Sequence, residues 1–424
     1  MSIKKEVCII GGGIAGLFAG LYLQKAGISS IIIEKKKMPG GLVGTFMMEN
    51  REFTIACNDF GKGFERECQQ LGVEIAFHRP KNVFLFTDRS LEIPFSLKTL
   101  KALLPYLSEM MKTFFSKRDA GLTLTAFFDK NVQSQPARDL LNLLSYPLGL
   151  TEDQIGIDEL RREIKDHHGY GYGQPRTPKG GLKALIDALV KRYQQLGGEL
   201  ILGTEGKIQD SKTGVVIAGD QQINAGAIMT CEGKWSSYPT DTPTSLFWGM
   251  FLVSLDKAIF PKNTHTLAFF APGIAQHMQL LNNGILPDEF TFHLFKSGAD
   301  NDKPPYNFNI LFYLPRDQVE LSEQELAKIK SFIFSQIAKV IPNFRQAMVF
   351  NHYLSPTEFA SVHGFSAQTI PLQLSTWQQK PDVFDAKTGL YYLGNSVGPS
   401  GDHAGQAILS AQWAVDKLLQ QRKK

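Results

Sequence analysis

The sequence predicts an α/β protein with two sheets, one parallel and one mostly antiparallel. Residues 6–10 and 29–34 are apolar runs without alternation, and a helical segment over residues 14–26 separates them. Such runs are typical of parallel strands covered on both faces, and a strand, helix and strand in about 30 residues form a βαβ unit. From residue 246 the pattern changes to alternating, aromatic-rich segments, as in a half-exposed antiparallel sheet.

The remaining elements follow from apolar spacing and end signals. Strands are expected over residues 246–255, 266–270, 290–295 and 308–314. Helices are expected over residues 97–115, 179–196, 322–340 and 404–419. Pro105 should break or kink the first of these helices, and Ser322 with Glu325 forms a capping box at the third. Repeats and low-complexity linkers are absent, so we expect the second domain to be inserted into the first.

Composition excludes several classes of protein. Hydrophobic residues are 43% of the 424 and charged residues 20%, values that fit neither a disordered chain nor an ordinary membrane protein. The net charge of +4 is mild, and the longest basic run is Lys35–Lys37, so a nucleic-acid partner is not expected. The 38 glycines are gathered in clusters, which indicates several specialised turns.

The cysteines and the first apolar stretch bear on location. The four cysteines form no CxxC pair and no metal-ligand spacing with histidine, so we expect no metal site and a reducing compartment. Residues 7–23 superficially resemble a signal peptide or a short anchor. They contain five glycines and lead into a second strand, however, so the cytoplasm is the predicted location.

The first glycine cluster has the pattern of a dinucleotide-binding turn. Gly11, Gly13 and Gly16 follow a strand and open a helix, whose first turn would offer the backbone N–H groups of Ile14 and Ala15 to a pyrophosphate. Glu34 ends the second strand 18 residues after Gly16, where a carboxylate would bind ribose hydroxyls. We count the adjacent Lys35 as a further cofactor-binding candidate.

A second glycine pair follows at once, with Gly40, Gly41 and Leu42. With this pair the sequence resembles the FAD-binding superfamily of flavin amine oxidases, phytoene-type desaturases and protoporphyrinogen oxidases. Residues 178–182, followed by a helix, are similar to that superfamily's second FAD-domain segment.

The last glycine cluster is similar to the superfamily's C-terminal flavin motif. It contains Gly394 and Asn395, and then Gly405, Gln406 and Ala407 at the start of a helix. The resemblance implies that Asn395 contacts the flavin ribityl chain or the pyrophosphate. It also implies that the start of the helix faces the flavin pyrimidine edge.

The resemblance, which spans residues 7–419, implies a Rossmann-like FAD-binding domain with an inserted α+β substrate domain. Residues 1–76, 177–240 and 385–424 would form the former, and residues 77–176 and 241–384 the latter. The implied function is oxidation of a C–N or C–C bond of a small organic or lipophilic substrate, by hydride transfer to FAD.

Departures from the superfamily's pattern suggest further site residues. Leu42 stands where arginine is usual, and Asn58 lies where a glycine usually packs near the flavin ring. His403 is a candidate for proton transfer beside the flavin. Tyr172, in an aromatic glycine loop, and Trp248 are candidates for the substrate cavity.

Other interpretations stay open. Residues 97–118 carry lysines beside an apolar stripe and could lie on a membrane surface or simply pack on the core. The chain could also be a non-redox flavoenzyme, such as an isomerase or a protein resembling UDP-galactopyranose mutase, or a flavin-binding protein with reduced activity. The sequence carries no signal for an oligomeric state.

Overall fold

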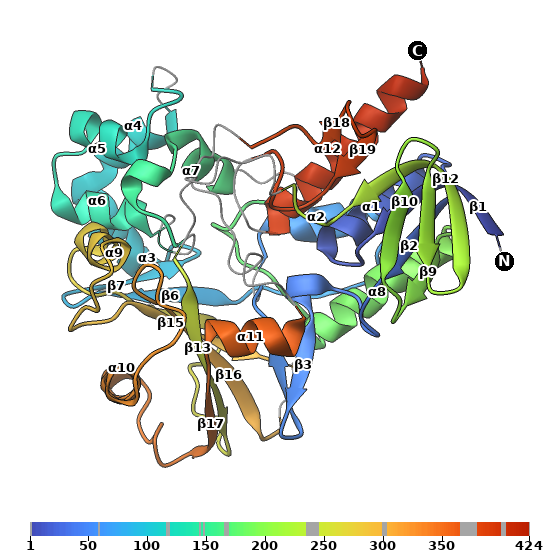
Figure 1. Ribbon diagram of the computed structural model, residues 1–424. Coiled ribbons are helices and arrows are strands. Elements are labelled where there is room, and N and C mark those ends of the chain that lie inside the picture. The colour runs from blue at the N-terminus through green and yellow to red at the C-terminus, as the bar shows by residue number, and fades with distance from the viewer. Residues whose placement is uncertain are drawn as a thin grey trace.

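Two sheets lie side by side in a computed structural model of the chain (Figure 1). The structure describes residues 2–57, 60–115, 119–143, 146, 149–164, 169–234, 246–298, 303–364, 380–399 and 404–423.

The first sheet is built around the predicted βαβ unit. Its eight strands run in the order β10–β11–β12–β1–β2–β9, with β19 beside β12 and β18 beside β19. The bounds are β1 (Ser2–Ile10), β2 (Ser30–Glu34), β9 (Glu199–Leu202), β10 (Gly206–Asp210), β11 (Val215–Ala218), β12 (Gln221–Thr230), β18 (Phe384–Asp385) and β19 (Leu390–Tyr392). Strands β9, β2, β1, β12 and β19 pair in parallel, so their carboxyl ends meet at one edge.

Helices cover one face of this sheet. They are α1 (Ile14–Lys25), α2 (Lys62–Leu71), α8 (Gly181–Gln195) and α12 (Ala404–Arg422). Their buried side chains form one apolar core with Val7, Ile9 and Ile32, which lie on the same face of β1 and β2. Helix α1 is buried almost all round, because α8 and α12 both pack on it.

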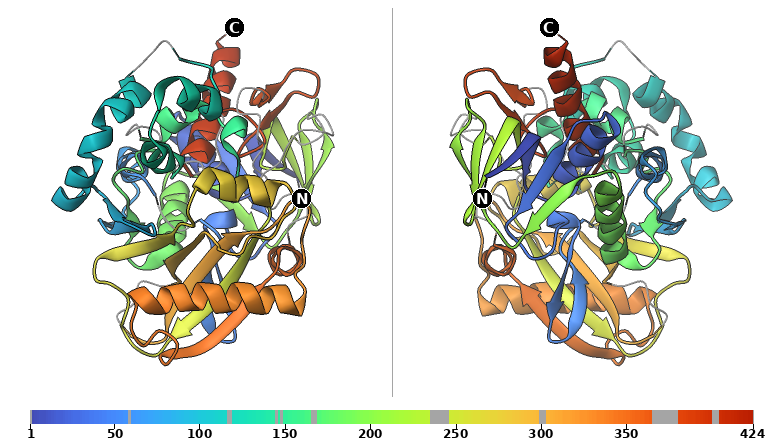
Figure 2. Two further views of the ribbon diagram at one scale, coloured as in Figure 1. Left: turned by 90° about the vertical axis from the view of Figure 1, so that its left-hand side faces the viewer. Right: turned by 90° about the vertical axis from the view of Figure 1, so that its right-hand side faces the viewer.

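The second sheet is mostly antiparallel, in the order β17–β13–β16–β15–β14–β6–β7. The bounds are β6 (Lys81–Leu85), β7 (Ser90–Ile93), β13 (Trp248–Leu255), β14 (Thr264–Phe269), β15 (Phe292–Ser297), β16 (Tyr306–Tyr313) and β17 (Met348–Leu354). Figure 2 shows α10 (Glu323–Val340) lying across its lower face, where an apolar core separates helix and sheet. Its other face packs on α9 (Ile274–Asn282) and α11 (Pro356–His363).

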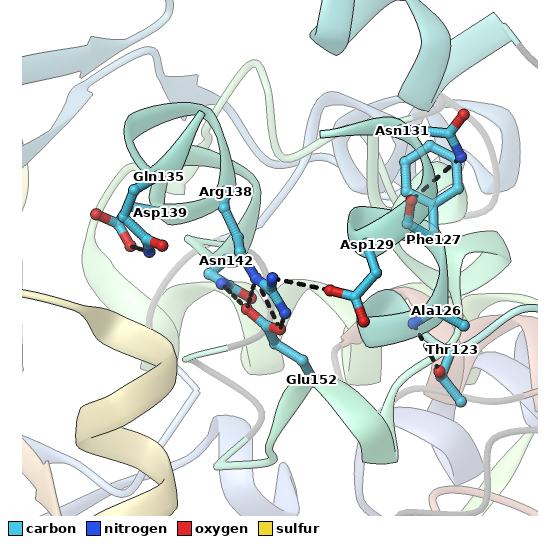
Figure 3. Close-up of polar contacts among 10 residues, drawn as sticks. All are labelled: Thr123, Ala126, Phe127, Asp129, Asn131, Gln135, Arg138, Asp139, Asn142 and Glu152. Atoms are coloured by element: carbon cyan, nitrogen blue, oxygen red, sulfur yellow. Dashed lines mark hydrogen bonds and ion pairs between the residues drawn. The ribbon is translucent and has the colours of Figure 1, made fainter. Parts of the chain in front are cut away.

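Short helices form a cluster near β7, at one edge of the second sheet (Figure 1). They are α3 (Leu97–Leu103), α4 (Leu107–Phe115), α5 (Leu124–Asn131), α6 (Gln135–Asn142) and α7 (Ile157–Ile164), with the 3₁₀ turns η2 (Leu104–Tyr106) and η4 (Glu152–Gln154). An ion pair fixes α6 to η4: Arg138 donates to the buried carboxylate of Glu152, which Asn142 also contacts, and to Asp129 (Figure 3).

Two short strand pairings connect these parts. The hairpin of β3 (Thr45–Met48) and β4 (Arg51–Thr54) follows the turn η1 (Gly41–Val43). Strands β5 (Phe77–His78) and β8 (Thr177–Pro178) pair with each other.

The fold class predicted from the sequence is confirmed, and so are the helices and the second-sheet strands. Pro105 interrupts its helix with the turn η2, and Ser322 caps α10 in the predicted capping box. Residues 7–23 form parts of β1 and α1, and no helix within the described residues is long and apolar enough to cross a membrane.

Candidate functional site

The first glycine cluster lies at the carboxyl edge of the parallel sheet, where β1 passes into α1. A methyl group added at Gly16 would lie 2.0 Å from the carbonyl oxygen of Gly11, so this glycine permits the close contact of helix and strand. Gly11 has φ +107°, a backbone conformation that favours glycine. Within the described residues no side chain caps α1 and its first turn holds no acid, so no acidic side chain of the helix itself competes for the backbone N–H groups at its start.

The second glycine pair contacts the first directly. The N–H of Gly40 donates to the carbonyl of Gly12 over 2.8 Å, and a methyl group on Gly41 would lie 3.2 Å from the Cα of Gly13. The carbonyl of Leu42 accepts the N–H groups of Ala56 and Cys57, whereas its side chain is 37% exposed. The two pairs therefore form one continuous backbone surface.

Glu34 is buried at the end of β2, beside this surface. Its carboxylate accepts the N–H of Gly12 over 2.6 Å and the N–H of Lys36 over 2.9 Å. A carboxylate can accept about four hydrogen bonds, so it can still receive ribose hydroxyls. The ammonium group of Lys35 instead donates to the carbonyl of Gly364, at the end of α11, over 2.8 Å. Lys35 therefore connects β2 to α11, a helix that packs on the second sheet.

The C-terminal segment reaches the same edge through β19. The N–H of Leu393 donates to the carbonyl of Thr230, and the following Gly394 donates its N–H to Ser410 of α12. Gln406 is fully buried, and its Nε2 lies 2.9–3.1 Å from the carbonyls of Gly394, Val397 and Pro399. Asn395, which follows Gly394, is half-buried. Gly405 and Ala407 lie in the first turn of α12.

The glycine loop at residues 169–173 packs between the N-termini of α2 and α12. Gly63 donates its N–H to the carbonyl of Tyr170 over 2.7 Å. A methyl group on Gly405 would lie 2.9 Å from the ring of the fully buried Tyr170. The adjacent Tyr172 is half-buried. These glycines therefore allow the loop to lie against two helix ends.

One residue at this edge was missed by the sequence reasoning. Cys231 follows β12, and its thiol lies 3.6 Å from the carbonyl of Gly11. Burial raises the pKa of this thiol to about 12, so it stays protonated and lies beneath the turn, between the carbonyl of Gly11 and the N–H of Gly16. The sequence held no signal for this position, because the pairing of β12 with β1 is seen only in the structure.

The other site candidates are placed differently. Asn58 and His403 lie outside the described residues. Trp248 begins β13 and is buried edge-on against Phe359 of α11, with ring centroids 4.5 Å apart. In the part of the chain that is described, no group of three or more histidine, cysteine or acidic side chains could hold a metal ion.

Comparison with known families decides the class of this site. The family model described as FAD dependent oxidoreductase (DAO) matches residues 6–247, more than half of the chain. The chain belongs to this family. Its cofactor is therefore FAD, and the protein is an FAD-dependent oxidoreductase.

Individual proteins agree with this family. The chain is 23% identical to the lycopene-forming phytoene desaturase of Pseudescherichia vulneris, over 95% of this chain and 96% of that enzyme. It is 34% identical to the thioredoxin reductase of Helicobacter pylori, over only 16% of this chain and 24% of that enzyme. A putrescine oxidase structure has the same fold, with a TM-score of 0.65 at 14% identity, over 99% of this chain and 100% of that one.

The residues at the sheet edge fit FAD. Gly13 and Gly41 face each other and have no side chains, so a pyrophosphate could approach the backbone there. Glu34 offers a buried hydrogen-bond acceptor beside them. The segment 394–399 and the start of α12 lie at the same edge, because the preceding strand β19 pairs with β12 and Leu393 donates its N–H to Thr230.

Proposed function

We propose that this protein dehydrogenates an uncharged, lipophilic substrate, as an FAD-dependent desaturase does. When bound, FAD supplies the two-electron acceptor, and the protein binds and orients the substrate and excludes water. Gly11, Gly13, Gly16 and Glu34 would hold the adenosine and pyrophosphate end, and the segment beginning at Gly394 and Asn395 the flavin end. The domain boundaries inferred from the sequence are part of this proposal.

The observation that carries the proposal is an apolar core that begins at the glycine turn. Ile55 donates its N–H to the carbonyl of Gly44, and the carbonyl of Thr54 accepts the amide of Asn309 in β16. Phe53 and Ile55 are buried in the core on the upper face of the second sheet. The residues that contact Gly44, just after the second glycine pair, therefore belong to an apolar region.

Aromatic side chains dominate this apolar region. Tyr146 lies edge-on to His293 at 4.9 Å and to Tyr313 at 5.3 Å between ring centroids, and Phe270 lies 5.5 Å away. The hydroxyl of Tyr146 donates to the carbonyl of Thr291. Burial lowers the pKa of His293 to about 4, so this histidine is neutral near pH 7. The side chains of this region are therefore apolar or neutral.

The buried carboxylates all have other partners. Glu34 binds backbone N–H groups, Glu67 the hydroxyl of Tyr22, and Asp119 the ammonium of Lys130. Glu152 binds Arg138, and the last buried carboxylate of the described residues, Glu159, is also partnered. Burying a cation without a counter-charge is costly, so this arrangement favours an uncharged substrate over a protonated amine.

We propose further that residues 97–118 contact a membrane surface from which the substrate enters. Apolar side chains 47–80% exposed follow one another at helical spacing in α3, η2 and α4, and in the preceding turn: Phe95, Leu97, Leu100, Leu104, Leu107 and Met111. An exposed apolar patch of this kind is rare on a protein that stays in water. Leu103, on the neighbouring side of α3, is buried in the apolar core. One short helix thus connects the exposed stripe to the apolar core on the upper face of the second sheet.

The charges beside this stripe suit anionic lipid. Lys98 and Lys101 are exposed on α3. Glu109 is half-buried, and its carboxylate accepts hydrogen bonds from the hydroxyl of Ser134 and the N–H of Gln133. Basic residues near a surface of anionic headgroups contribute about 1 kcal/mol each.

Anaerobic flavin reduction tests the substrate class. The purified protein should be yellow, and its absorption should bleach with an uncharged polyene dispersed in lipid vesicles but not with a primary amine. Bleaching by the amine alone would replace the desaturase proposal with amine oxidation. Turnover that requires reduced flavin but has no net oxidation would indicate an isomerase.

Vesicle flotation tests the membrane contact without reference to activity. The wild type should float with vesicles that contain anionic lipid, and L104E should stay behind. L202E, at a leucine 39% exposed on β9, is the matched control and should float like the wild type. Equal flotation of L104E and the wild type would refute this contact.

A further inference from the structure

Gln406 connects the start of α12 to the segment 394–399. It is fully buried, and its amide is directed at that segment. Its Nε2 lies 3.0 Å from the carbonyl of Gly394, 2.9 Å from that of Val397 and 3.1 Å from that of Pro399. Two amide hydrogens thus serve three carbonyls, and they fix this segment to the start of α12.

Ser410 reinforces the same connection one turn later. Its hydroxyl accepts the N–H of Gly394 over 2.9 Å and donates to the carbonyl of Ala407 over 2.7 Å. Residues 406 and 410 are four apart, so both lie on the same face of α12. The segment 394–399 therefore depends on two side chains of one helix.

The other atom of the Gln406 amide lacks a partner. Its Oε1 is buried and accepts no hydrogen bond within the described residues. A buried acceptor without a donor costs free energy, and such an atom in a binding region indicates a missing ligand group. FAD has the matching donors, which are the ribityl hydroxyls and the N–H of the flavin pyrimidine.

We infer that Gln406 positions the flavin end of FAD through both atoms of its amide. Nε2 holds the segment 394–399, and Oε1 accepts a hydrogen bond from FAD. This inference rests on the proposed placement of the flavin at this segment. The amide would act on the flavin half of the cofactor and leave the adenosine half, at Glu34 and the first glycine turn, unaffected.

FAD and ADP binding to the apoprotein, measured by titration, separate these halves. Q406L should raise the Kd for FAD about tenfold, equivalent to a lost interaction of about 1.4 kcal/mol, while the Kd for ADP stays within about twofold of the wild type. Q412L changes a glutamine on the same helix that lines a surface pocket with Tyr22 and Asp416, and it should bind both ligands like the wild type.

Other outcomes would overturn the inference. An unchanged FAD affinity in Q406L refutes it, and so does an equal loss of FAD affinity in S410A, which keeps the Oε1 acceptor. If Q406L also loses ADP binding, Q406M, which keeps the length of the side chain, repeats the comparison; an equal loss of both ligands there shows a purely structural role. A wild type that binds ADP but no FAD would refute the proposed function instead.

Discussion

Substitution of Gly16 by alanine separates the role of helix packing from that of helix propensity. Alanine is favoured over glycine within a helix by about 1 kcal/mol, so propensity alone predicts a more stable protein. The added methyl carbon would, however, lie 2.0 Å from the carbonyl oxygen of Gly11. A carbon and an oxygen need roughly 3.3 Å, so α1 and β1 must separate by about 1.3 Å.

This separation should weaken FAD binding strongly. The N–H groups at the start of α1 would leave hydrogen-bond distance of the pyrophosphate, and each bond to a charged group contributes about 1.5–3 kcal/mol. Loss of two such bonds, about 3 kcal/mol, predicts a Kd for FAD about 100-fold higher, measured by quenching of flavin fluorescence.

Two matched variants control this experiment. Gly173 has open space around it and an ordinary φ, so G173A should bind FAD like the wild type. A methyl group on Gly20 would meet the buried ring of Tyr193 at 2.8 Å, on the side of α1 that does not contact Gly11, so G20A should lower stability but retain FAD. An unchanged Kd in G16A would refute the close contact and, with it, the position assigned to the pyrophosphate.

Two further predictions concern stability. Burial lowers the pKa of His277 to about 4, so the unfolded chain binds a proton below pH 6.5 that the folded protein refuses until about pH 4. Stability should therefore fall as the pH drops from 7 to 4, by about 2 kcal/mol at pH 5 for this residue, and chemical denaturation of H277Q should show a correspondingly smaller acid dependence. In E152Q, loss of the buried pair with Arg138 should cost about 3 kcal/mol in urea unfolding. K183Q, which breaks the exposed pair with Asp187, should cost less than about 0.5 kcal/mol, and equal losses would contradict the role given to burial.

Local patterns predicted most of the fold. Apolar runs located β1 and β2, and a capping box placed the start of α10, because these signals act within a few residues of chain. The glycine pattern likewise located the turn at Gly11, since a tight turn before a helix needs glycine whatever surrounds it.

Contacts between distant segments could not be predicted in this way. Lys35 adjoins Glu34 in sequence, yet its ammonium group reaches Gly364, 329 residues away. The glycines near Tyr170 had no explanation until α2 and α12 were placed on either side of them. The exposure of the stripe at residues 97–111 was equally undetermined, because the same periodicity suits a helix that faces the core.

Anaerobic reduction of the bound flavin is the most direct test of the proposed function. The apolar region beside the glycine turn contains a neutral histidine, and the buried carboxylates of the described residues have other partners; together these predict rapid bleaching by an uncharged polyene presented in anionic vesicles and none by a primary amine. Bleaching by the amine with no response to the polyene would contradict the proposal.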